Sequence, residues 1–168
     1  MASKTRVSVD NQIAFDQFLS AAAVQSAANT FTQVTIPTLV NPDDERILQI
    51  KEIQVLINGS VPINAFQAWV GLSLTRESKA ALPDLTDNSL IARYQFTSLG
   101  GGSFAAGAAG VVESPINMAY SGKQIIAAPN VYLQINSSGL VNALNTSLRV
   151  YYESIKMSKA DILEILYG

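Results

Sequence analysis

Hydrophobic and polar residues alternate with a period of two over most of the chain. Residues 32–36 alternate and then meet Pro37, which is typical of an edge strand. Residues 47–57 form the clearest strand pattern, and the turn signal Asn58-Gly59 follows them. Similar patterns cover residues 66–75, 90–97, 111–112, 116–120, 124–127, 131–135 and 148–157.

These segments predict about eight short strands, separated by turn signals and without intervening helical blocks. That layout favours an all-β, antiparallel, jelly-roll-like β-sandwich over a parallel α/β fold. Alternation buries one face of each strand. We expect the following residues to be mostly buried: Ile47, Ile53, Val55, Ile57, Phe66, Val70, Leu72, Ile91, Tyr94, Ile135, Val150 and Tyr152.

The two ends of the chain depart from this pattern. Phe15, Phe18, Leu19 and Ala22 have helical spacing after Asp10, so residues 1–30 are predicted to form an N-terminal arm, part helical and part extended. The sandwich is then assigned to residues 31–157.

A short helical tail is predicted for residues 158–168. Ser158 resembles a helix N-cap, with Asp161 three residues later. The residues after it leave almost no polar face, so the tail must dock against protein. It either contacts another subunit or closes one end of its own sandwich, and the sequence leaves both open.

The amino-acid composition limits the kinds of chemical function that the chain can have. The 168 residues include no Cys and no His, which removes disulfides, thiolate nucleophiles and the usual triads and transition-metal sites. Only 14% of the residues are charged and the net charge is −2, which favours self-association. We expect no enzymatic activity, no cofactor, no metal and no catalytic residue.

Three features could be read as functional sites, and for each of them we prefer a purely structural interpretation. Asp43-Asp44-Glu45 lacks the ligand spacing of a calcium loop and is interpreted as a solvated turn. Residues 100–110 are rich in glycine but lack the pattern of a phosphate-binding loop. Trp69 and the tyrosines lie in or beside strands and are assigned to packing rather than to base or sugar stacking.

Basic residues are scarce near the N-terminus, where Lys4 and Arg6 are the only ones before Arg46. Strong direct binding of nucleic acid is therefore not expected. No stretch is long and apolar enough for a transmembrane segment, and no targeting segment is visible.

The arm, the strand pattern, the small-residue loop and a final strand over residues 148–155 that leads into an apolar tail together resemble single jelly-roll capsid proteins of small icosahedral viruses. The resemblance implies a structural protein that self-assembles into a capsid shell as the major capsid protein. Its partners would be copies of itself and other capsid proteins, and its location the virion, assembled in the host cytoplasm. The N-terminal arm of this chain is nearly neutral. In this it differs from viral coat proteins whose basic arm neutralises the genome.

The alternative is a β-sandwich carbohydrate- or protein-binding module, similar to a lectin or adhesin. An enzyme is the third choice. The enzyme class that remains open is a glycosidase that uses two carboxylates. For assembly, we expect contacts from apolar side chains in the arm, the glycine-rich loop and the tail: Phe15, Phe18, Leu19, Phe104, Ile162, Leu163, Ile165, Leu166 and Tyr167.

Overall fold

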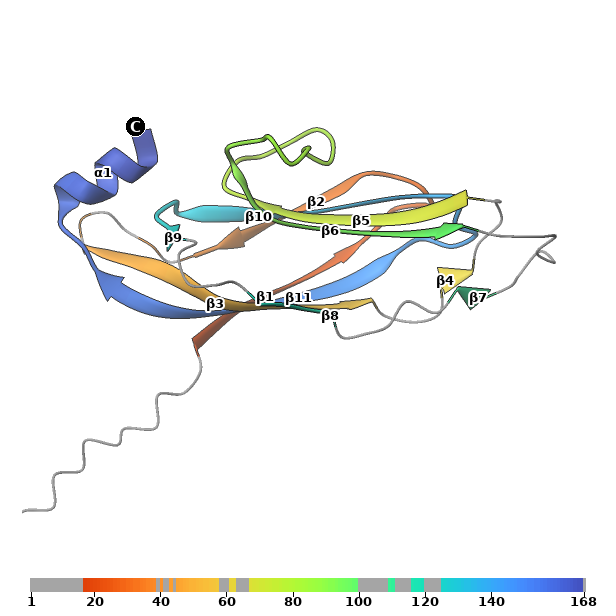
Figure 1. Ribbon diagram of the computed structural model, residues 1–168, viewed down its shortest axis with the longest axis horizontal. Coiled ribbons are helices and arrows are strands. Elements are labelled where there is room, and N and C mark those ends of the chain that lie inside the picture. The colour runs from red at the N-terminus through yellow and green to blue at the C-terminus, as the bar shows by residue number, and fades with distance from the viewer. Residues whose placement is uncertain are drawn as a thin grey trace, which may run out of the picture.

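Two antiparallel sheets pack face to face, and a short helix follows at the C-terminus, in the computed structural model of the chain (Figure 1). The structure describes residues 17–38, 40, 43, 45–57, 61–62, 67–99, 109–110, 116–119 and 125–167.

The first sheet has five strands in the order β1-β11-β3-β8, with β9 also paired to β3. Its strands are β1 (Gln17–Val24), β3 (Arg46–Ile57), β8 (Ile116–Ala119), β9 (Ile125–Ile126) and β11 (Asn145–Lys156).

The second sheet has four strands in the order β2-β10-β5-β6. Its strands are β2 (Thr32–Pro37), β5 (Gln67–Thr75), β6 (Leu90–Leu99) and β10 (Asn130–Ser138). A separate pair joins β4 (Val61–Pro62) to β7 (Ala109–Gly110), and the helix α1 spans Lys159–Tyr167.

The pairing is nested from the ends of the chain inward. β1 pairs with β11, β2 with β10, β3 with β8 and β9, and β5 with β6, all antiparallel. A long hairpin that is rolled into two layers produces this order, which is the jelly-roll arrangement. The predicted fold class, an antiparallel all-β sandwich with a short C-terminal helix, is confirmed.

The helix predicted around Phe18 is wrong, because residues 17–24 form β1 and pair with β11 along their whole length. Leu19 and Ala23 point into the core while Phe18 is exposed, so the burial has a period of two. A short apolar segment fits both periods, and the hydrogen bonds offered by β11 decide between them. The sandwich therefore begins by residue 17 rather than at residue 31, while residues 1–16 lie outside the described part.

The core lies between the sheets and matches most of the predicted set. Tyr94 and Tyr152 are only half-buried, although both pack against the core, and Phe66 lies outside the described residues. The buried residues of the set are Ile47, Ile53, Val55, Ile57, Val70, Leu72, Ile91, Ile135 and Val150.

Candidate assembly surfaces

Phe18 is an exposed aromatic on the outer face of the five-stranded sheet. Its side chain is 48% exposed, and its ring centre lies 5.9 Å from that of Tyr151 on β11. The guanidinium carbon of Arg149 lies 4.8 Å from the same ring centre, which is a cation–π geometry. The neighbouring Leu19 points inward into the core, so of this pair only Phe18 leaves apolar surface exposed.

A hollow of about 560 Å³ lies on the same outer face, over β1, β11 and β3. It forms because the outward-pointing side chains Ser20, Ala22 and Ser147 are small. The full lining consists of Ser20, Ala21, Ala22, Gln54, Val55, Leu56, Ser147, Leu148 and Arg149.

Exposed apolar residues gather around this hollow. Leu56 is 42% exposed in its wall, and Val24 is 57% exposed two residues beyond Ala22 on the outer face of β1. With Phe18, three of the six large hydrophobic residues that are exposed in the described part lie on this one face. Such clustering is typical of a protein contact surface rather than of scattered exposed residues.

The opposite outer face, that of the four-stranded sheet, is partly covered by residues 76–89, which connect β5 to β6 and are named the strap here. Figure 1 shows the strap arching above this sheet. Gln33 on β2 donates to Ser78 Oγ at 2.7 Å and accepts from the backbone N–H of Lys79 at 2.8 Å. Beneath the strap, Gln134 is fully buried and bonded to Ser73, Thr75 and Gln33.

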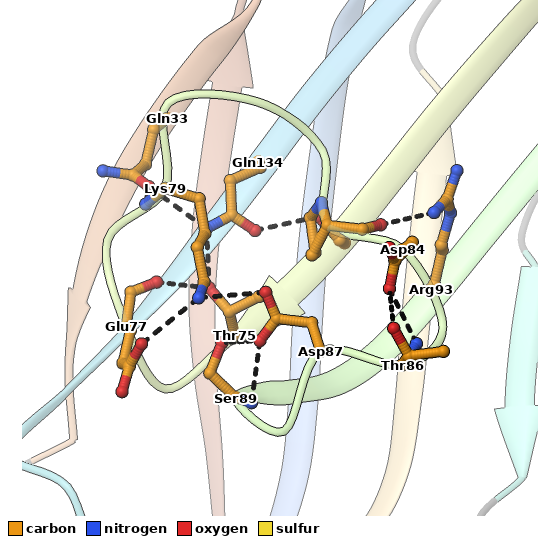
Figure 2. Close-up of polar contacts among 12 residues, drawn as sticks. Gln33, Thr75, Glu77, Lys79, Asp84, Thr86, Asp87, Ser89, Arg93 and Gln134 are labelled. Carbon is orange, nitrogen blue, oxygen red and sulfur yellow. Dashed lines mark hydrogen bonds and ion pairs between the residues drawn. The ribbon is translucent and has the colours of Figure 1, made fainter.

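Charged groups fix the shape of the strap (Figure 2). Lys79 Nζ lies 2.9 Å from Asp87 Oδ2 and 3.2 Å from Glu77 Oε2. Asp87 Oδ1 accepts from the backbone N–H of Ser89 at 2.9 Å and from its hydroxyl at 2.6 Å. The hydrogen bond from the Ser89 hydroxyl has the largest effect on Asp87 and, together with the hydrogen bond from Lys79, lowers the pKa of Asp87 to about 2. The hydrogen bond to Asp87 raises the pKa of Lys79.

We expect the Tm of the Asp87→Asn variant to fall less than that of the wild type as the pH is lowered from 7 to 2. The pKa of Asp87 falls from 3.8 to about 2 on folding, so the folded state binds fewer protons. Its contribution is therefore complete above about pH 4 and is lost as the pH falls toward 2. Asparagine keeps an acceptor for Ser89 but not the charge that pairs with Lys79.

Thermal unfolding at pH 7, 4, 3 and 2 measures this effect. The variant should have a lower Tm than the wild type at pH 7, and the two curves should converge toward pH 2. Parallel curves across that range would contradict the assignment.

The C-terminal helix starts as the sequence predicts. Ser158 Oγ accepts from the backbone N–H of Asp161 at 3.3 Å and donates to its carboxylate at 2.6 Å, so the N-cap is confirmed. Ile162 is fully buried in a small cluster with Ile47 and Ala127. The side chain of Ile162 is thus covered by other residues of the same chain, whereas Leu163 is 40% exposed.

The remaining expected contact residues fall outside what the structure describes. Phe15 and Phe104 are not in the described ranges. Residues 165–167 belong to α1, but the side chains of Ile165, Leu166 and Tyr167 are not described. Their roles in assembly stay predictions.

In the described ranges, no group of three Asp or Glu side chains is arranged to hold a metal ion. Asp43 instead pairs with Lys159 at 2.5 Å, and Asp44 lies outside those ranges. No helix that the structure describes is long and apolar enough to cross a membrane.

No protein-family model matches the sequence, and no curated protein matches it.

Sequence reasoning predicted a loop at Pro83-Asp84 and Asp87-Asn88 but missed the hollow and the anchoring of the strap on β2. The hollow depends on three small residues from two strands that are more than a hundred positions apart, and no local pattern marks it. The strap did carry a signal, since Asp84 and Asp87 each precede a hydroxyl residue by two positions, which is the spacing of Asx turns.

Proposed function

We propose that this chain is the structural subunit of a viral capsid shell, a major capsid protein whose copies assemble through the outer faces of the sandwich. The observation that carries the proposal is the apolar surface of Phe18, Val24 and Leu56 around the hollow, on a chain with little charge. A monomer would leave this surface in water, whereas an assembly of copies covers it.

The jelly-roll order of the strands supports the proposal. This fold occurs in viral capsid and lectin domains alike, and a fold by itself does not assign a function. The near-neutral N-terminal segment favours a shell protein that does not neutralise the genome directly. The virion, assembled in the host cytoplasm, is the location that goes with this proposal.

The purified chain is expected to form closed particles or capsomers at micromolar concentration. Light scattering after gel filtration measures the mass, and negative-stain microscopy shows the shape. Phe18→Ser should reduce assembly because it removes exposed apolar surface at little cost to the fold, since Phe18 is not part of the core. Val141→Ser, which changes an exposed residue in the turn between β10 and β11, serves as the control.

A chain that stays monomeric up to about millimolar concentration would contradict the capsid proposal. The lectin-like alternative would then take precedence, because the hollow has the size of a small-ligand site and includes polar groups from Gln54, Ser147 and Arg149. That alternative predicts a monomer whose Tm rises when a sugar or peptide ligand is added.

A further inference from the structure

Leu85 is the most exposed large hydrophobic residue among those described, with 80% of its surface in water. It sits in a tight turn in which the backbone N–H of Asp87 donates to the carbonyl of Asp84 at 3.4 Å. Asp84 Oδ1 also accepts from the backbone N–H and hydroxyl of Thr86, at 2.8 Å and 2.6 Å. These bonds hold the backbone on both sides of Leu85, so its side chain projects from a fixed position.

The strap that carries this turn is anchored on both sides. Leu82 packs against Gly71 so closely that a Cβ atom at position 71 would lie 2.5 Å from Leu82 Cδ1. Arg93 on β6 donates to the carbonyl of Pro83. Leu85 therefore cannot fold back onto its own sheet without breaking these contacts, and a projection held in this way loses little entropy when it docks.

A receptor for such a projection lies on the other outer face of the molecule. The lining of the hollow combines small side chains with the apolar side chain of Leu56, the amide of Gln54 and the positive charge of Arg149. Leu85 is flanked on the strap by the carboxylate of Asp84. An apolar knob beside a negative charge can thus contact Ala22 and Leu56 in the hollow while its carboxylate lies near the positive charge of Arg149.

We propose that Leu85 of one copy inserts into the hollow on the five-stranded sheet of the next copy, with Asp84 near Arg149. Figure 1 shows the strap on the side of the four-stranded sheet, with the five-stranded sheet as the other layer of the sandwich. The strap carries Leu85 and the five-stranded sheet carries the hollow on its outer face, so a single chain cannot fill its own hollow. The contact is heterologous, and successive copies close into a ring when the rotation between them permits. The inference rests on the proposed self-assembly and specifies which faces meet.

Leu85→Ser tests the knob, and Ala22→Trp tests the hollow by filling it. Each variant should raise the concentration required for assembly by about tenfold or more, because a buried leucine is removed or blocked. Both positions are exposed, so the fold and the Tm of the subunit should stay unchanged. Val141→Ser, at another exposed apolar residue, should leave assembly unaffected.

Cross-linking gives a direct readout, because the natural chain has no cysteine. Leu85→Cys and Ala22→Cys proteins are mixed, assembled and treated with a short bismaleimide. Cross-linked dimers that contain one copy of each variant support the proposal, and Val141→Cys mixed with Ala22→Cys is the control pair.

The outcomes separate this inference from the capsid proposal. A wild-type chain that never assembles overturns both. Assemblies that are insensitive to Leu85→Ser and yield no cross-link above the control overturn the knob-and-hollow contact alone. A cross-link between Thr5→Cys and Ala22→Cys in its place would assign the hollow to the N-terminal segment.

Discussion

Replacing Ile162 by alanine is expected to lower the free energy of unfolding by about 2–4 kcal/mol and the Tm by about 5–15 °C. Ile162 is fully buried and forms the small second core with Ile47 and Ala127. Its removal leaves a cavity at the end of the sandwich and weakens the docking of α1. Chemical denaturation of the isolated subunit measures the change.

Leu163→Ala is the matched control, since it alters the next residue of the same helix. Leu163 is 40% exposed, so its truncation should cost less than about 1 kcal/mol. Equal effects of the two substitutions would show that the burial of Ile162 does not set the stability of this end of the sandwich. An unchanged Tm for Ile162→Ala would show that the helix does not close its own subunit.

The same burial predicts the effect of deleting residues 158–168. Because Ile162 is covered by its own subunit, we expect the truncated subunit to unfold at a lower temperature. A failure of the truncated chain to assemble would then follow from its instability. Contacts through Leu163 are tested separately by the point variant, which leaves the fold intact.

Gln25→Ala is expected to cost about 2–5 kcal/mol, because it leaves several buried polar groups without their partner. Gln25 is only 2% exposed and lies just after β1. Its Oε1 accepts from the backbone N–H of Leu144 at 2.8 Å and from the hydroxyl of Ser137 at 3.1 Å. Its Nε2 donates to the carbonyl of Thr30 at 2.5 Å.

These bonds join the loop after β1 to β10 and to the turn before β11, so the substitution should open this end of the sandwich. The control is Gln17→Ala, at an exposed position of β1, which should change the stability by less than about 0.5 kcal/mol. Amide hydrogen exchange at Leu144 should accelerate only in the Gln25 variant. Unchanged protection there would contradict the assigned role.

Several parts of this protein follow from the sequence alone. The period of two predicted the strands over residues 32–36, 47–57 and 90–97, because a half-buried strand must alternate. The pair Ser158 and Asp161 predicted the start of the helix, because an N-cap is satisfied by residues within one turn. The lack of His and Cys limited the available chemistry from the start.

The tertiary structure decided what depends on partners distant in the chain. Residues 17–24 are a strand because β11 supplies their hydrogen bonds, about 130 positions further along. The hollow exists because the register places Ala22 beside Ser147, and Leu85 projects because Gly71 on β5 and Arg93 on β6 anchor the strap beside it. Local patterns record which residues prefer burial, whereas register and strand order determine which side chains share a face.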